Sequence, residues 1–288
     1  KIIGALAAVA VVAVGVWYFV GNLNAVQEQS SPIAGVSSEL YEQGLALIQQ
    51  HADNTYVQSL LTQAQQSMLP AVEYRVIANG IDTTCFRPGD RAAARAALDL
   101  PTTAPTVLFA SASSKNIYKD PATMARAILA MAERVPGLHV LCVGAALPDR
   151  ALRRLAIRQV PYVRDPQKMA QLYRAADLFV HTAKAEAFGK TVTEAMACGT
   201  PVVASAVGGI VEQIIAGKTG FLCPAGDATS MAEAAVEFFS ADAERRDAMR
   251  AAAAQRGAGF SLDRQVQAFL GWYEEILAQE PWRGRSGR

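Results

Sequence analysis

The chain has 288 residues, of which 27 are basic and 26 are acidic, and 51% of its residues are hydrophobic. The charges nearly cancel and no basic stretch is interleaved with aromatic residues, so the composition argues against a nucleic-acid-binding protein. The sequence contains no Asp-x-Asp motif, and its three histidines and four cysteines are scattered. It therefore shows no pattern that is typical of a metal site.

Residues 2–20 form an uncharged apolar run, rich in Ala and Val, that ends in Trp17, Tyr18 and Phe19. A helix rises about 1.5 Å per residue, so a run of this length is just able to cross a bilayer, and aromatic residues suit the interface. A cleavable signal peptide is the alternative, with Lys1 as its positive start, but bulky residues at the end of the run favour an anchor. We therefore expect a single-pass transmembrane helix over residues 1–21.

Residues 22–74 are polar at first and then rich in Gln, Leu and Ala with helical spacing. Ser37 and Asp53 are suitable N-caps, which predicts a linker followed by a small helical segment. Residues 1–74 carry one basic and five acidic side chains, whereas residues 75–288 carry 26 basic and 21 acidic ones. This change in charge places a domain boundary near residue 75.

From residue 75 on, short apolar runs alternate with helical stretches. The predicted strands are residues 106–110, 139–143, 159–162, 178–181, 201–204 and 220–223. The predicted helices are residues 121–135, 149–158, 166–175, 190–197, 210–216 and 229–239. This alternation predicts an α/β fold, with a Rossmann-like parallel sheet, helices on both faces, and a ligand crevice beyond the carboxyl ends of the strands.

Two glutamates eight positions apart follow the strand expected at residues 178–181. Glu186 lies in the turn after this strand, and Glu194 lies on the next helix. The backbone N–H groups at the start of this helix are those of Phe188, Gly189, Lys190 and Thr191. Free N–H groups at a helix N-terminus favour a phosphate, and Glu194 can reach the hydroxyls of a ribose. The alternative is that both glutamates are solvated surface charges. The surrounding motifs decide between this alternative and a ligand site.

Further motifs occur in a fixed order between residues 76 and 273. They are Val76-Ile-Ala-Asn-Gly-Ile-Asp82 with Phe86-Arg-Pro88, Tyr173-Arg-Ala-Ala-Asp-Leu-Phe-Val-His181, the glutamate motif, Val207-Gly-Gly-Ile210 with Glu212, and Gly217-Lys-Thr-Gly-Phe-Leu-Cys-Pro224 with Gly226-Asp227. In this order they resemble the C-terminal, donor-binding domain of GT-B glycosyltransferases of family 4. The resemblance implies a single GT-B half-domain over residues 75–288. It also implies a nucleotide diphosphate sugar as donor, retention of configuration, and no metal or other cofactor.

The resemblance also assigns roles to individual residues. In the family, an arginine and a lysine followed by glycine neutralise the diphosphate. Lys119 matches the lysine, Asp120 replaces the glycine, and Lys115 either supplies the missing positive charge or is a surface lysine. Glu194 is expected at the ribose hydroxyls. Glu186 is expected beside the donor sugar as the catalytic residue, which positions the sugar and stabilises the transition state without acting as a general base.

Two further positions have an open interpretation. Backbone groups around Tyr162 are expected at the nucleobase, but Tyr162 equally fits a half-buried residue of the sheet. Gly208 and Gly209 are predicted to be turn residues first and neighbours of the ligand second.

A complete enzyme of this family also has an N-terminal domain that binds the acceptor, whereas only about 70 residues precede the first motif here. Three interpretations therefore stay open. The chain is the donor-binding half of a glycosyltransferase that acts on a glycan or lipid-linked acceptor, or a non-catalytic nucleotide-sugar-binding subunit that needs a partner chain. Otherwise it is a truncated or fused chain that acts as a membrane-anchored interaction module. Because nucleotide sugars are made in the cytoplasm, we expect the donor domain on the cytoplasmic face of the inner membrane.

Overall fold

A computed structural model of the chain describes residues 76–111, 117–144, 152 and 154–278. The predicted membrane anchor, the linker and helical segment at residues 22–74, and Lys115 lie outside these residues. Among the helices that are described, none is long and apolar enough to span a bilayer. The anchor and its place in the inner membrane therefore stay predictions.

Six strands form one parallel sheet, as the alternating pattern predicted. They are β1 (Thr106–Ser111), β2 (His139–Gly144), β3 (Ala156–Val160), β4 (Leu178–His181), β5 (Val202–Ser205) and β6 (Gly220–Cys223). Their order across the sheet is β3-β2-β1-β4-β5-β6, and each neighbouring pair is parallel. The chain builds outward from β1 to β3 and then returns to the centre at β4. In such sheets the ligand crevice lies where the order reverses, which here is between β1 and β4.

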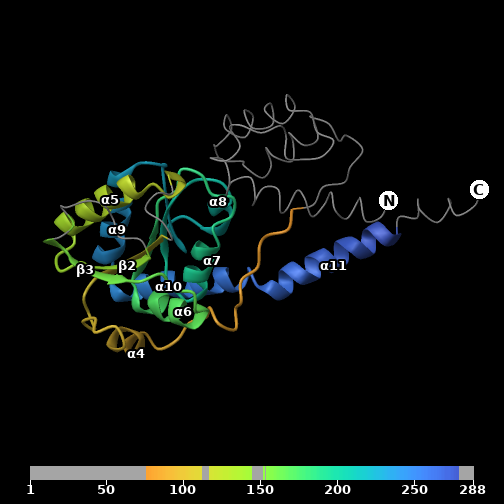
Figure 1. Cartoon of the computed structure of the whole chain (residues 1–288), viewed down its shortest axis with the longest axis horizontal. Helices are drawn as coiled ribbons and strands as arrows, with labels where there is room; N and C mark the ends of the chain where they lie inside the picture. The colour runs from red at the N-terminus through yellow and green to blue at the C-terminus, as the bar shows by residue number, and fades with distance from the viewer. Residues whose placement is uncertain (1–75, 112–116, 145–151, 153, 279–288) are drawn as a thin grey trace, which may run out of the picture.

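Helices follow the strands and begin at recognisable caps. They are α4 (Arg91–Ala96), the short 3-10 helix η2 (Ile117–Lys119), α5 (Pro121–Arg134), α6 (Pro166–Ala175), α7 (Lys190–Ala197), α8 (Ile210–Gln213), α9 (Ala228–Ser240), α10 (Ala243–Ala258) and α11 (Leu262–Ala278). An aspartate side chain accepts a hydrogen bond at the start of α4, α5, α6, α9 and α10. This is the residue type that satisfies free N–H groups there. Figure 1 shows α11 running away from the sheet.

The sheet is buried on both faces. Alternate residues of β1 belong to different cores: Leu108 packs with residues of α6 and α7, whereas Val107 and Phe109 pack with residues of α5 and α9. Because both faces are covered, the central strands are continuous apolar runs without a polar side. The prediction of an α/β fold with helices on both faces is confirmed.

Two predicted boundaries near residue 156 are wrong. Residues 156–158, expected at the end of a helix, belong to β3, and the strand expected at residues 159–162 ends at Val160. The strand β3 lies at the edge of the sheet, and polar residues such as Arg158 and Gln159 interrupt its apolar pattern. Its pairing with β2 therefore determines its structure, which local propensity does not report. The helices α4, α10 and α11 were not predicted.

Three arginines hold the N-terminal end of β4. Asp177 directly precedes this strand and forms ion pairs with Arg91, Arg95 and Arg250, and its contact with Arg95 measures 2.7 Å. Asp177 also accepts a hydrogen bond from the backbone N–H of Thr106, at 2.9 Å. The guanidinium group of Arg95, which is buried, donates to backbone carbonyls between α4 and β1 as well. This cluster joins α4, β1, β4 and α10 at the sheet end opposite the predicted crevice.

Candidate functional site

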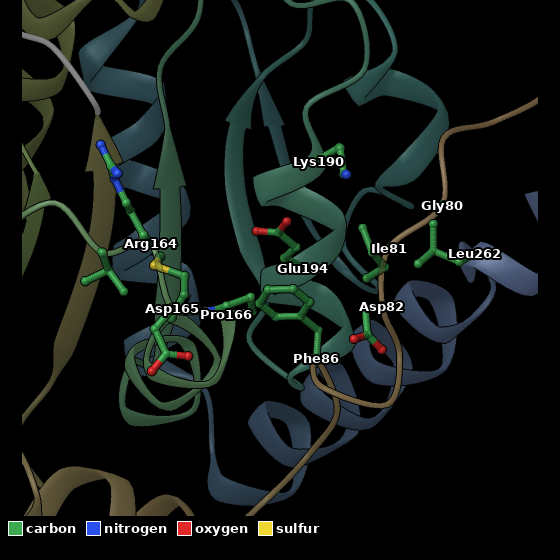
Figure 2. Close-up of a pocket in the computed structure, with 12 residues that line it drawn as sticks. Gly80, Ile81, Asp82, Phe86, Arg164, Asp165, Pro166, Lys190, Glu194 and Leu262 are labelled. Atoms are coloured by element: carbon green, nitrogen blue, oxygen red, sulfur yellow. The ribbon is translucent and has the colours of Figure 1, made fainter.

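A cavity of about 320 Å³ opens beyond the carboxyl ends of the strands. Its walls come from the segment before α4, from the loop between β3 and α6, from α7 and from the start of α11. The lining residues are Gly80, Ile81, Asp82, Phe86, Val163, Arg164, Asp165, Pro166, Met169, Lys190, Glu194 and Leu262. In Figure 2 the segment with Ile81, Asp82 and Phe86 lies on one side of α7, and Arg164, Asp165 and Pro166 lie on the other.

Glu194 lies on α7 and lines this cavity. The hydroxyl group of Tyr173, from α6, donates a hydrogen bond to Glu194 Oε2 at 3.3 Å. Burial raises the pKa of Glu194, and the hydrogen bond from Tyr173 and the charge of Lys190 offset only part of this effect. Tyr173 is fully buried, so its hydroxyl group is a fixed hydrogen-bond donor to Glu194. The carboxylate of Glu194 also lines the cavity. A partly dehydrated carboxylate of this kind is suited to accept hydrogen bonds from ligand hydroxyls.

A second group of polar side chains lies at the carboxyl ends of β1 and β4. Lys119, at the end of η2, forms an ion pair with Glu186 Oε2. His181, the last residue of β4, places its Nε2 atom 3.1 Å from Lys119 Nζ and 3.6 Å from Glu186 Oε2. Burial would raise the pKa of Glu186, but the adjacent His181 ring and the charge of Lys119 outweigh it and lower this pKa to about 2. Glu186 is therefore ionised near neutral pH.

Hydrogen bonds to backbone carbonyl groups join the loop after β1 to the loop after β4. Thr182 Oγ1 donates to the carbonyl oxygens of Lys119 and Asp120, at 3.0 and 3.1 Å, and the N–H of Lys184 donates to the carbonyl of Tyr118 at 2.8 Å. Asp120, which stands where the family usually has glycine, has a φ of 42° and caps α5 through Thr123. An aspartate tolerates this left-handed conformation better than most residues, so the loop keeps its turn without the glycine.

The start of α7 lies between the two groups. Gly189 precedes the helix with a φ of 85°, and within the described residues no side chain caps this end of α7. A Cβ atom on Gly189 would lie 3.3 Å from Glu186 Cγ, which shows how closely Glu186 approaches the helix terminus. The side chain of Gln213 donates to the carbonyl of Phe188 and so holds this turn from the side of α8. An open helix terminus next to a lysine is suited to an anion.

The family assignment agrees with this geometry. The pattern described as glycosyl transferases group 1 matches residues 90–256, which is more than half of the chain. The chain belongs to this family.

Two curated relatives of this chain are named as glycosyltransferases. A D-inositol 3-phosphate glycosyltransferase 1 from Catenulispora acidiphila is 38% identical over 225 residues, which cover 72% of this chain and 52% of that protein. A D-inositol 3-phosphate glycosyltransferase from Mycolicibacterium paratuberculosis is 36% identical over 216 residues, which cover 71% of this chain and 48% of that one. The chain thus spans about half the length of these curated relatives.

Solved structures share the fold of this chain. Sucrose-phosphate synthase from Thermosynechococcus elongatus has a TM-score of 0.66 and 26% identity over 87% of this chain and 65% of that one. Anabaena HepE in complex with UDP-glucose has a TM-score of 0.63 and 24% identity over 78% of this chain and 63% of that one. The C-terminal domain of a group 1 family protein from Francisella tularensis is covered completely, with a TM-score of 0.55 and 19% identity over 64% of this chain.

The structure brings four of the nine predicted site residues into two neighbouring groups. Glu194 and Lys190 line the cavity, whereas Glu186 and Lys119 form an ion pair beside it. Phe188, Gly189 and Thr191 do not line the cavity. They belong to the start of α7, where the ring of Phe188 packs edge-on against Phe260 at 5.9 Å between centroids.

Tyr162 lies beyond the end of β3 and is 60% exposed. It is therefore not a half-buried residue of the sheet, which was one of its two interpretations. The cavity wall begins at the next residue, Val163. Contact between a nucleobase and the backbone near Tyr162 stays a prediction.

Sequence reasoning missed several residues of the site. Tyr173 and His181 were seen only as parts of a family motif, and their contacts with Glu194 and Lys119 depend on how β1, α6 and β4 pack. Asp82 and Leu262 line the cavity from opposite ends of the described chain. The motif that runs from Val76 to Asp82 was a usable signal for the first of these.

Proposed function

We propose that this chain is the donor-binding part of a retaining glycosyltransferase, which holds a nucleotide diphosphate sugar for transfer to a glycan or lipid-linked acceptor. One observation carries this proposal. Glu194 faces the cavity from α7, is held by Tyr173, and lies about one helical turn from the uncapped start of the same helix. A ribose at Glu194 therefore brings the attached diphosphate toward the free N–H groups of α7.

The volume and lining of the cavity support a small ligand. At about 320 Å³, it lies at the lower end of the range of roughly 300–1,000 Å³ found for small-molecule sites. Apolar side chains such as Phe86, Val163 and Met169 line it together with Glu194 and Lys190. This mixture of apolar walls and a few polar groups suits a nucleoside.

The second group would act on the rest of the donor. Lys119 offsets the charge of the diphosphate as a point cation, and Glu186 positions the sugar and stabilises positive charge that develops on it. In the transfer, the bond between the anomeric carbon and the diphosphate oxygen breaks, and an acceptor oxygen bonds to that carbon on the same face. The leaving diphosphate takes the proton of the acceptor hydroxyl. In the described part of the chain, no group of three or more His, Cys, Asp or Glu side chains could hold a metal ion.

Calorimetric titration with UDP-glucose and with GDP-mannose tests the donor site. We expect one of them to bind, Glu194→Gln to weaken that binding at least about tenfold because two hydroxyl hydrogen bonds to a charged group are lost, and EDTA to leave it unchanged. The matched control is Glu133→Gln, at an exposed glutamate of α5 that does not line the cavity. Binding that Glu194→Gln does not weaken would refute the proposed site.

A second candidate function is a nucleotide-sugar-binding subunit that transfers the sugar only with a partner that supplies the acceptor domain. Leu262, Val266 and Leu270 form an exposed apolar stripe along α11, four residues apart, and Leu262 also lines the cavity. This stripe favours an acceptor-binding partner at α11. A transfer assay on the isolated chain, with release of nucleoside diphosphate as the readout, separates the two. Turnover without a partner would exclude the subunit.

A further inference from the structure

His181 lies at the meeting point of Lys119 and Glu186 and is only 4% exposed. Its Nε2 atom faces both charged groups, at 3.1 Å from Lys119 Nζ and 3.6 Å from Glu186 Oε2. Its Nδ1 atom is buried and has no hydrogen-bond partner among the described residues. A buried ring with one unsatisfied nitrogen is costly to keep.

A single ring nitrogen cannot serve both neighbours at once. To accept a hydrogen bond from the Lys119 ammonium group, Nε2 needs its lone pair, whereas to donate to Glu186 it needs a proton. The distance to Lys119 is within the hydrogen-bond range and the distance to Glu186 is beyond it. We therefore assign a neutral ring to the free protein, with Lys119 as donor and the proton on Nδ1.

We propose that His181 is a positioning residue that exchanges partners when the donor binds. In the free protein Nε2 accepts from Lys119. When Lys119 turns to the diphosphate, the ring takes up one proton from solvent at Nε2. The protonated Nε2 then donates a hydrogen bond to the Glu186 carboxylate, so that the carboxylate keeps a partner. This inference rests on the proposed function, because it requires that Lys119 meets the diphosphate. The exchange prevents the carboxylate of Glu186, which is only 18% exposed, from being left unpaired at the moment when it must position the sugar.

The surrounding charges agree with this exchange. In the described part of the chain, the charged groups that face the ring are Lys119 from η2 and Glu186 from the loop after β4, whereas Lys184 and Asp120 face each other at 4.0 Å. Burial lowers the pKa of His181, the nearby carboxylate of Glu186 raises it, and the charge of Lys119 lowers it. Moving Lys119 away therefore removes a cause that keeps the ring neutral, and the remaining neighbour favours the protonated ring.

The first test needs no ligand. NMR titration of the histidine rings follows His181 in the wild-type protein and in Lys119→Met, with the half-buried His139 as an internal reference. We expect the pKa of His181 to be higher in Lys119→Met. An unchanged pKa of His181 would overturn the inference, whatever ligand the protein binds.

The second test measures proton uptake during binding. UDP-glucose or GDP-mannose, whichever binds, is titrated near pH 7 in PIPES and in Tris, two buffers with different ionisation enthalpies. Both phosphates of these donors are diesters, so the ligand itself does not titrate there. We expect the wild-type protein to take up a fraction of a proton, His181→Gln to take up none, and the control His139→Gln to match the wild type. Uptake that is absent in the wild type, or that persists in His181→Gln, would refute the exchange.

The affinity for the donor distinguishes a positioning role of His181 from a role in packing alone. The amide that His181→Gln introduces can accept from Lys119 and donate to Glu186 without titrating. We therefore expect this variant to bind within about threefold of the wild type, whereas His181→Phe binds about tenfold more weakly. Equal affinities for both variants would contradict a positioning role. If the wild-type protein binds neither donor, the proposed function fails, and the ligand-free titration still decides the state of His181.

Discussion

Gly208 packs directly on the backbone of Glu186. A Cβ atom at position 208 would lie 1.7 Å from the carbonyl oxygen of Glu186, and one at Gly209 would lie 2.7 Å from that of Ala187. The loop after β5 therefore supports the loop that carries the catalytic candidate. Gly208 and Gly209 are turn residues, as predicted, and they also determine where Glu186 lies.

Gly208→Ala should destabilise the protein more than an ordinary glycine substitution does. Gly208 has a φ of 49°, and its Cβ would overlap backbone atoms that cannot move independently. We expect the free energy of unfolding to fall by more than about 2 kcal/mol, since backbone strain and a steric overlap add. Gly217→Ala is the control, because Gly217 also has a positive φ, of 73°, but has open space around its Cβ position. It should lose only about 1 kcal/mol. Urea unfolding measures both, and equal losses would contradict the packing argument.

Tyr173→Phe should weaken donor binding without unfolding the domain. The change removes the hydroxyl group that donates to Glu194 and nearly conserves the volume of a buried ring. We expect affinity to fall about fivefold, the equivalent of one hydrogen bond of roughly 1 kcal/mol. Because this hydrogen bond lowers the pKa of Glu194, its loss should move the acidic limb of binding, measured by titration calorimetry, to higher pH. Tyr162→Phe, at an exposed ring, should change neither quantity.

The ionisation of Glu186 should make the stability of the folded protein depend on pH. Its pKa is lowered from 4.5 to about 2 in the folded protein, so its ionised form stabilises the fold above pH 4.5. This contribution is lost as the pH falls from 4.5 toward 2, and it amounts to at most about 3 kcal/mol. Unfolding followed from pH 6 to pH 2 should therefore show a smaller loss for Glu186→Gln than for the wild type. Glu133→Gln should follow the wild-type curve, and parallel curves for all three proteins would contradict the lowered pKa.

Asp177→Asn should be among the most destabilising polar changes in the domain. It removes the carboxylate that pairs with the buried Arg95 and with two further arginines. A buried charge left without its partner typically costs about 3–5 kcal/mol. The control is Asp247→Asn, whose exposed carboxylate approaches Arg250 only at 3.8 Å and should change stability by less than about 0.5 kcal/mol. Similar thermal unfolding of the two variants would show that the Asp177 cluster is not structural.

Local patterns predicted the elements that carry the site better than those at its edges. The bounds of β4, α6 and α7 were predicted to the residue, because a short apolar run, an N-terminal Asp-Pro and a glycine before a helix are local signals. The strand β3 was misplaced because its position depends on pairing with β2, not on its own composition. The exposure of Tyr162 follows from the same shift.

The sequence by itself determined the succession of the six strands along the chain and the position of Glu194 on the helix after β4, since both follow from periodicity and from residues close together in the chain. Only the tertiary structure decided that β1 lies next to β4. That pairing brings Lys119 to His181 and Glu186, more than sixty residues further along. Local sequence does not encode which strands become neighbours, because strand pairing depends on how the whole sheet buries its two faces. The chemistry of the Lys119, His181 and Glu186 group therefore belongs to the fold.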